Sequence, residues 1–379
     1  MTASGGASTG SLRIIQNGAD FQSTAVIENM GNFGKIWPLR SRFHDVYVTH
    51  CVPKCSLHAL CRLDSHILAT NTQETILFSL DQPDNISVIP AQTAGFDPSP
   101  TLAVSNVALR RNIAGRMSYE DSSLIVQVTE KSVLLLEYDE VLQTHSVLTS
   151  WSPNTLGEEW ADRTIVAAAL NPSQFVLGLS RKRLVLLRLE ENNQFQIFRY
   201  SVSRLFFNDP FDMVLPRYKD LQEEISAISC TPFDTTKMFS LYIAVGFWST
   251  HTVDLLSVAS TDGYFEPVCN SVSLPALPRS LLLHDFGNAP QLLVGLRDGT
   301  LVAYAFKKNE LQDKRVFSLG TEPVCLTQIE MGEKKMVFAN GSRAALLYLE
   351  RGILHHSSIL IKVQFQSSCC EIAPLILFR

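Results

Sequence analysis

The chain has 379 residues, of which 46% are hydrophobic and 18% are charged, a composition that indicates a folded globular protein and excludes a disordered one. The formal net charge of −5 argues against a main surface that binds nucleic acid. No apolar run approaches the length of a transmembrane helix, and the opening MTASGGASTG lacks both the basic and the apolar part of a signal peptide, so we expect no membrane partner.

Residues 1–9 are expected to be a flexible lead-in. The densest group of soft metal ligands comes later and consists of His50, Cys51, Cys55, His58 and Cys61. Zinc needs four such groups converging on the ion, usually from paired short spacings, and these spacings match no standard pattern. We therefore predict no metal and no cofactor. The eight cysteines, in the absence of a secretory signal, are expected to be reduced thiols of the cytosol or nucleus.

Hairpin-like segments recur along the chain, each with an apolar strand, a polar turn and a second apolar strand. They are 66–80, 123–138, 174–189, 241–258, 292–306 and 335–349. Their turns are about 43 to 68 residues apart, a spacing typical of propeller blades, and the intervening sequence supplies two further strands per unit. Amphipathic helical patterns are nearly absent. We therefore predict an all-β fold, a β-propeller without the WD signature, with six blades between about residues 40 and 360.

Two stretches interrupt this repeat. Residues 81–121 contain four prolines, and residues 205–222 include FFNDPFDMVLPRYKD. Both are expected to be long excursions from the blade framework and to be at least partly mobile.

The segment LLVGLRDGTLVAYAF at 292–306 contains two glycines and raises the question of a phosphate-binding loop. Such a loop needs Lys-Ser or Lys-Thr after its last glycine and a helix behind it. Here Asp298-Gly299 is followed by the β-rich Thr300-Leu301-Val302. An Asp-Gly pair between apolar runs predicts a hairpin, and we expect a type I′ turn with positive φ at both central residues.

Other candidate sites are weak. The basic spots ALRRN (108–112) and SRKR (180–183) are short and lack interleaved aromatic residues for base stacking. Arg181-Lys182-Arg183 falls where a hairpin turn is predicted, which favours a solvated turn. The adjacent pairs His355-His356 and Cys369-Cys370 would point to opposite faces of a strand and are unsuited to one shared site.

No catalytic residue is predicted. No serine lies in a Gly-x-Ser-x-Gly elbow, and acidic residues gather in loops such as RYKDLQEE (217–224), which is more typical of a solvated turn than of a general-acid pair. Propeller enzymes do collect carboxylates and histidines at the axial channel, but nothing in the sequence marks such a set.

Trp248 is the strongest candidate for an interface residue. It follows the apolar strand that ends in Gly246-Phe247 and precedes the polar turn STHT. Tryptophan is a frequent interface anchor. The alternative, which the residues alone do not exclude, is that its ring caps the core of a blade.

The segments GSLRIIQNG (10–18) and GKIWPLR (34–40) begin a collinear series that resembles a known family. The series continues at 94–107, 224–233, 244–258, 277–286 and 319–326. It resembles the family of the large subunit of the UV-damaged-DNA-binding complex, a triple-propeller adaptor of cullin ubiquitin ligases. The related splicing-factor and polyadenylation-factor subunits are more distant in these stretches.

The resemblance implies an organisation. Residues 31–379 would be the middle propeller of three, with residues 10–30 the closing strands of a preceding propeller that is absent. The middle propeller would be truncated at its C-terminus, so that six complete blades belong to an incomplete seven-bladed ring. Segments 44–64 and 81–121 depart from the family pattern.

The resemblance also implies a function: a non-catalytic scaffold of a cullin-RING ubiquitin ligase, linked to the DNA-damage response, DNA repair and protein ubiquitination, in the nucleus and cytoplasm. Its partners would be the N-terminal helices of a cullin and the neighbouring propellers, with no strong nucleic-acid binding by this region. Trp248 and Glu224 match the cullin-facing side. The alternatives are an RNA-processing scaffold of the splicing or polyadenylation type and a propeller enzyme.

Overall fold

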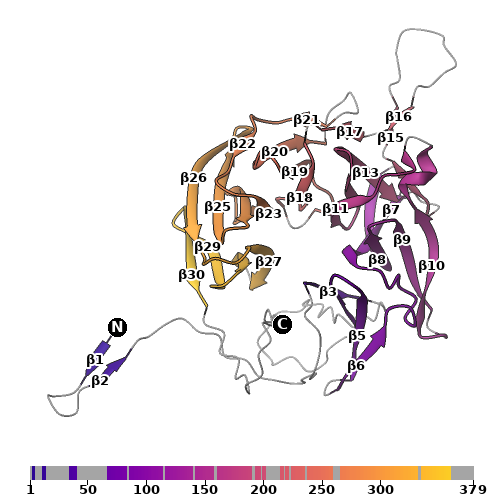
Figure 1. The fold of residues 1–379 in the computed structure, drawn as a ribbon, viewed down its shortest axis with the longest axis horizontal. Helices are drawn as coiled ribbons and strands as arrows, with labels where there is room; N and C mark the ends of the chain where they lie inside the picture. The colour runs from indigo at the N-terminus through magenta and orange to yellow at the C-terminus, as the bar shows by residue number, and fades with distance from the viewer. Residues whose placement is uncertain are drawn as a thin grey trace, which may run out of the picture.

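Six antiparallel sheets, which we call blades 1 to 6 in chain order, make up most of the described structure (Figure 1). The computed structural model describes residues 2–4, 11–13, 34–40, 66–82, 85–113, 116–139, 141–157, 160–189, 193–197, 199–201, 214–216, 218–221, 223–234, 237–258, 265–331 and 334–359. Helical structure in these residues is limited to 3₁₀ turns at and just after η1 (Pro153–Leu156). The predicted all-β fold with six blades is confirmed.

Each blade contains four or five strands. Blade 1 consists of β3 (Lys35–Leu39), β4 (His66–Thr70), β5 (Thr75–Gln82) and β6 (Asn85–Pro90). Blade 2 consists of β7 (Thr101–Ile113), β8 (Arg116–Thr129), β9 (Val133–Asp139) and β10 (Thr144–Trp151). Blade 3 consists of β11 (Ile165–Asn171), β12 (Gln174–Leu179), β13 (Arg183–Leu189), β14 (Phe195–Ile197) and β17 (Tyr218–Asp220).

Blade 4 consists of β18 (Ile225–Ser229), β19 (Tyr242–Phe247), β20 (Thr252–Ser257), β21 (Glu266–Pro267) and β22 (Val272–Ser273). Blade 5 consists of β23 (Pro278–Asp285), β24 (Pro290–Leu296), β25 (Thr300–Lys307) and β26 (Glu310–Ser318). Blade 6 consists of β27 (Cys325–Met331), β28 (Lys334–Asn340), β29 (Ala345–Glu350) and β30 (Ile353–Ser358). Two short pairs lie outside the blades, β1 (Thr2–Ser4) with β2 (Ser11–Arg13) and β15 (Arg199–Ser201) with β16 (Val214–Pro216).

The first strands of consecutive blades lie side by side around the centre of an arc, in the order β3, β7, β11, β18, β23, β27 (Figure 1). Blades 1 and 6 stand at the two ends of this arc in the described residues. The seventh blade and the division into 1–9, 10–30 and 31–379 stay predictions. None of the described helical segments is long and apolar enough to cross a membrane.

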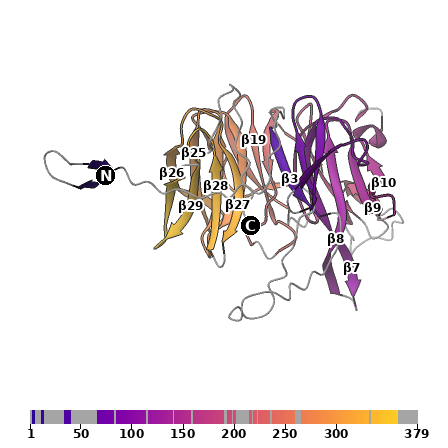
Figure 2. The same cartoon turned by 90° about the horizontal axis from the view of Figure 1, so that it is seen from below.

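The expectation that residues 81–121 leave the blade framework is wrong. Residues 85–90 form the fourth strand of blade 1, and β7 and β8 begin blade 2. These two strands have 13 and 14 residues, and they extend beyond the other strands on one side of the propeller (Figure 2). The amide N–H of Ala108 donates to the carbonyl oxygen of Pro172 at 2.7 Å, which fastens the extended hairpin to blade 3.

The second predicted excursion, 205–222, is described only in part. Its residues 214–216 form β16 and residues 218–220 form β17. Because β17 pairs with β13 inside blade 3, the end of this stretch is part of the framework rather than an excursion. The remaining positions lie outside the described residues.

The hairpin predicted at 292–306 is confirmed as β24 and β25, but its predicted turn type is wrong. Gly299 has a φ of 84°, whereas Asp298 is not among the residues with positive φ. The Asp298 side chain instead accepts the N–H of Thr300 at 3.0 Å, which gives a three-residue loop with one left-handed glycine. Two successive left-handed residues do occur at Arg181 and Lys182, where φ is 60° and 65°.

The hydrophobic core is a series of layers between neighbouring blades. One layer combines Val126 of blade 2 with Phe175 of blade 3, and another combines Leu255 of blade 4 with Leu292 of blade 5. A sheet packed on both faces needs apolar side chains on both faces. This is why strands such as β12, QFVLGL, are buried along their whole length and why the hairpins appear in the sequence as continuous apolar runs.

Glycines in the second strands of three blades let the next blade approach closely. The pairs in contact are Gly178 with Ile225, Gly246 with Pro278 and Gly295 with Val324. A Cβ atom at these glycines would lie 2.9, 2.9 and 2.3 Å from the nearest atom of the partner. None of the three has a positive φ, so the requirement for glycine is the space between blades and not the backbone conformation.

Gly295→Ala should destabilise the propeller, because its new Cβ would meet the backbone oxygen of Val324, which cannot rotate away. We expect the free energy of unfolding to fall by about 1–3 kcal/mol, measured by urea unfolding. Gly34→Ala is the matched control, since no atom lies within 4 Å of its Cβ position. Equal stability of the two variants would contradict the packing role.

Two buried histidines should make the fold sensitive to acid. Burial lowers the pKa of His145 to about 4 and that of His284 to about 4. His284 is fully buried, and neither ring nitrogen has a hydrogen-bond partner. Since the unfolded chain binds these protons near pH 6.5 and the folded chain does not, the free energy of unfolding should decline as the pH falls from about 6.5 to about 4.

His284→Leu should remove roughly 2 kcal/mol of this decline, measured as the difference in unfolding free energy between pH 7 and pH 4.5. His355→Gln, at an exposed position of β30, is the control and should retain the wild-type dependence. A His284→Leu variant as acid-sensitive as the wild type would show that other groups titrate in this range.

Candidate protein-binding rim

Glu224 and Trp248 lie opposite each other at one rim of blade 4. Glu224 immediately precedes β18 and Trp248 immediately follows β19, strands in which Ile225 pairs with Phe247. The N–H of Trp248 donates to the carbonyl oxygen of Glu224 at 3.0 Å. In an antiparallel pair the start of one strand meets the end of the next, so these two residues lie close together at the rim.

The turn after β19 holds the indole at the surface. Phe247 is buried in the layer between blades 3 and 4, whereas the side chain of Trp248 is 44% exposed. The carbonyl oxygen of His251, at the end of the turn, accepts the N–H of Leu274 at 2.9 Å. The backbone of the turn is therefore tied to the blade at both ends, and the alternative that Trp248 caps a blade core is not what the structure shows.

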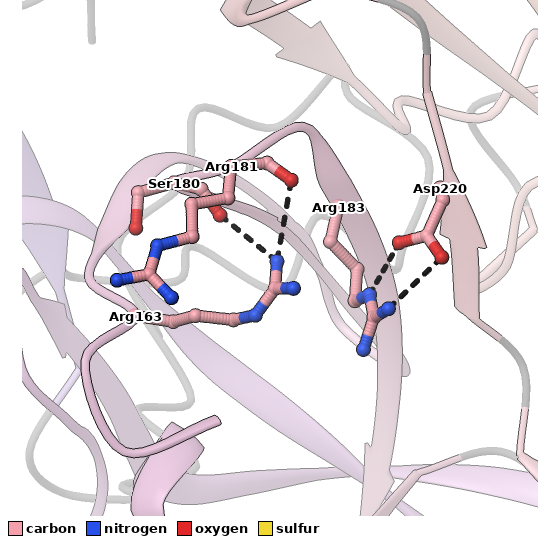
Figure 3. Close-up of polar contacts among 5 residues, drawn as sticks. All are labelled: Arg163, Ser180, Arg181, Arg183 and Asp220. Atoms are coloured by element: carbon pink, nitrogen blue, oxygen red, sulfur yellow. Dashed lines mark hydrogen bonds and ion pairs between the residues drawn. The ribbon is translucent and has the colours of Figure 1, made fainter. Parts of the chain in front are cut away.

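An ion pair on blade 3 fixes the segment that leads to Glu224 (Figure 3). Arg183 begins β13 and lies opposite Asp220 of β17. Its Nη2 donates to Asp220 Oδ2 at 2.9 Å, and its Nε donates to Oδ1. The hydrogen bond from Arg183 lowers the pKa of Asp220 below its usual range. The N–H of Leu221 also donates to the carbonyl oxygen of Lys182 at 2.7 Å.

The guanidinium of Arg183 is largely shielded from water. Its side chain is 10% exposed, and its Cζ lies 4.4 Å from the centre of the Trp160 ring, which is a cation–π contact. The Cζ of Arg163 lies 5.5 Å from the centre of the same ring. The Nη1 of Arg163 donates to the carbonyl oxygens of Ser180 and Arg181 at 3.1 and 3.3 Å (Figure 3).

The basic spot at 180–183 is thus a hairpin turn, as predicted, but only part of it is solvated. Arg181 is exposed and forms an ion pair with Asp162 at 3.5 Å. Arg183 is committed to Asp220. The sequence did not reveal this pair, because 37 residues separate its members and only the pairing of β17 with β13 brings them together.

The remaining candidates are described only in part. The cluster from His50 to Cys61 and the pair Cys369-Cys370 lie outside the described residues, as do the side chains of Arg110 and Arg111 in ALRRN. His355 stacks on Tyr348, whereas the ring of His356 contacts Phe317; the predicted opposite orientation is confirmed. Within the described part of the chain, no group of three or more His, Cys, Asp or Glu could hold a metal ion.

Comparison with known proteins identifies the fold family. Residues 23–371 match the family model described as the RSE1/DDB1/CPSF1 second beta-propeller. DNA damage-binding protein 1 of Oryza sativa subsp. japonica is 24% identical over 368 residues, and DNA damage-binding protein 1a of Arabidopsis thaliana is 23% identical over 367 residues. Each alignment covers 96% of this chain and 28% of the relative, so the chain spans less than a third of their length.

Asp220→Asn should loosen the segment before β18, since it removes the charge that pairs with a shielded guanidinium. We expect faster amide hydrogen exchange at Leu221 and Trp248 and a loss of about 1 kcal/mol of stability, a small value because Asp220 itself is 59% exposed. The control is Asp313→Asn, which breaks the exposed pair with Lys307 on blade 5. Unchanged exchange at both amides would contradict the positioning role of Asp220.

Proposed function

The chain belongs to the RSE1/DDB1/CPSF1 second beta-propeller family, and from this premise we propose that it is a non-catalytic scaffold that holds protein partners in fixed positions. The relatives named above are called DNA damage-binding protein 1 and DNA damage-binding protein 1a, and they align with 96% of this chain. Their names support a role in the DNA-damage response. We further propose that the scaffold is the adaptor of a cullin-RING ubiquitin ligase and acts in the nucleus and cytoplasm.

The proposed contact with the cullin is the rim at Glu224 and Trp248. The observation that carries it is the indole of Trp248, which is 44% exposed. The backbone N–H of Trp248 is hydrogen-bonded to the carbonyl oxygen of Glu224, whose side chain is a carboxylate. An exposed aromatic ring beside an acidic group suits a helical partner with an apolar stripe and a basic residue. The N-terminal helices of a cullin would supply this partner.

The mechanism of such a scaffold is positional. The rim is built from turns that are fastened to regular strands, so little conformational freedom is lost when a partner binds. The neighbouring propellers of the longer protein would hold the substrate receptor, while blade 4 holds the cullin. This region would not itself grip nucleic acid.

The two alternatives have less support. The splicing and polyadenylation relatives share the family, but the aligned proteins of Oryza sativa and Arabidopsis thaliana carry the DNA damage-binding name. A propeller enzyme would need a cluster of carboxylates, and the acidic segment 217–224 was the candidate for one. Its Asp220 instead forms an ion pair with Arg183. We therefore do not propose either.

Trp248→Ala should weaken binding of a peptide with the cullin N-terminal helices roughly thirtyfold or more, because truncating a central aromatic anchor costs about 2 kcal/mol or more. Glu224→Ala should cost less and should reduce the dependence of affinity on salt. The measurement is peptide affinity by calorimetry at two salt concentrations.

The control for this test is Val316→Ala, which truncates a side chain that is 56% exposed on the outer strand of blade 5. Folding of each variant is checked by its unfolding midpoint. Equal affinities for wild type and Trp248→Ala would place the cullin contact elsewhere or remove it from this chain.

A further inference from the structure

A cavity lies between blades 5 and 6, which stand side by side in the arc (Figure 1). Its volume is about 130 Å³, close to that of an engineered protein cavity that binds benzene. The apolar part of its wall comes from β25 on one blade and from β29 and β30 on the other, through Ala303, Ala305, Leu349 and Leu354. The cavity is therefore large enough for one small ligand or one amino-acid side chain.

Two long polar side chains reach this cavity from either side of β25. Ala305 of β25 pairs with Gln291 of β24, and Ala303 pairs with Arg315 of β26. Alternate residues of a strand share a face, so all four side chains are on one face of blade 5. The strands β24 and β26 are about 10 Å apart, and the small alanines between them leave the space that forms the cavity.

Gln291 is a buried amide without a partner at this wall. It is 7% exposed, and within the described residues its side chain has no hydrogen bond. It faces blade 6, because Leu293 on the same face of β24 packs in one layer with Val337 of blade 6. Its cross-strand neighbour His284 also lacks a hydrogen-bond partner. A buried polar group needs a partner, so Gln291 indicates that a polar group binds in the cavity.

The charged groups that line the cavity leave one cation for a ligand. Lys307 Nζ donates to Asp313 Oδ2 at 2.6 Å, so these two charges offset each other. Arg315 Nη1 donates to the carbonyl oxygen of Leu354 at 3.1 Å, which uses one of the five N–H donors of a guanidinium. In the part of the chain that the structure describes, no carboxylate forms an ion pair with Arg315. The lining is thus positive by one charge.

The walls are fixed by hydrogen bonds. Asp285 Oδ1 accepts the N–H groups of Gly287 and Ala289 at 3.0 and 2.6 Å, which holds the turn between β23 and β24 at one edge of the cavity. The bond from Arg315 to Leu354 joins the two blades across it. Such a site loses little conformational freedom when a ligand binds.

We propose that this cavity binds a carboxylate carried on a small aliphatic group. The guanidinium of Arg315 would pair with the carboxylate, the amide N–H₂ of Gln291 would donate to it, and the aliphatic group would lie on Ala305. A phosphate fits less well, because only one cation is unpaired and much of the wall is apolar. The ligand group occurs both in small carboxylic acids and in the C-terminal residue of a protein. The site shares no residue with the rim of blade 4 and does not depend on the cullin contact.

The test measures binding of isovalerate to the whole chain by ligand-observed NMR, with a Kd of about 1 mM or tighter expected for a ligand of this size. Isovaleramide, the matched neutral compound, should bind at least about tenfold more weakly. Arg315→Gln should weaken isovalerate binding at least about tenfold, and Gln291→Leu about threefold to tenfold. The control is Arg297→Gln, which removes an exposed arginine from the turn between β24 and β25 and should bind as the wild type does.

A second variant separates binding from packing, since Arg315 also joins the two blades. Ala305→Leu keeps Arg315 but fills the cavity, and it should abolish binding while the unfolding midpoint shows that the chain is folded. An acetylated dipeptide that ends in valine with a free carboxylate distinguishes the two sources of the ligand. Affinity equal to or above that of isovalerate assigns the site to a protein C-terminus, and weaker affinity assigns it to a small acid. Both agree with the proposal.

Three results would overturn the proposal. The first is that neither isovalerate nor the dipeptide binds. The second is equal affinity for isovalerate and isovaleramide, which would mean that the cavity does not recognise the carboxylate. The third is unchanged affinity in a correctly folded Arg315→Gln or Ala305→Leu variant, which would place the bound acid elsewhere on the chain.

Discussion

The close contact between one blade's second strand and the next blade's first strand is the constraint on which the architecture depends. Gly246 illustrates it, because Pro278 of blade 5 occupies the space that a side chain would need. The same residue lies in β19 directly before Phe247, the buried last residue of that strand, which Trp248 follows. The packing that sets the distance between blades thus also sets the point at which the chain reaches the surface and exposes the indole. The hydrogen bond from the N–H of Trp248 to the carbonyl oxygen of Glu224 holds the two residues of the rim together.

The blades were accessible from the sequence because they follow from local patterns, whereas Glu224 was matched with Trp248 through the resemblance to a known family. A sheet buried on two faces produces continuous apolar runs such as that of β12, and polar turns between the runs mark the hairpins. Once Glu224 was placed at the start of one strand and Trp248 at the end of the next, antiparallel pairing brought them together. The extent of exposure of Trp248 was not predictable, since it depends on the turn that follows.

The features that escaped prediction depend on contacts between distant segments. In the sequence, Arg183 looks like one of three basic turn residues. The strand β17, 37 residues later, pairs with β13 and places Asp220 against Arg183. The prolines of 81–121 suggested an excursion, whereas the stretch forms the end of blade 1 and a long hairpin fastened to Pro172. The Asp298-Gly299 turn was assigned the wrong type because the Asp298 side chain, by bonding to Thr300, stabilises a three-residue loop.

We propose that the rim of blade 4 at Glu224 and Trp248 binds the cullin. Amide hydrogen exchange of the whole chain, with and without a peptide of the cullin N-terminal helices, tests it most directly. We expect slower exchange at residues 223–226 and 248–252 and no change at residues 141–148 of blade 2. Protection confined to other blades, or no protection at a peptide concentration that saturates binding, would contradict it.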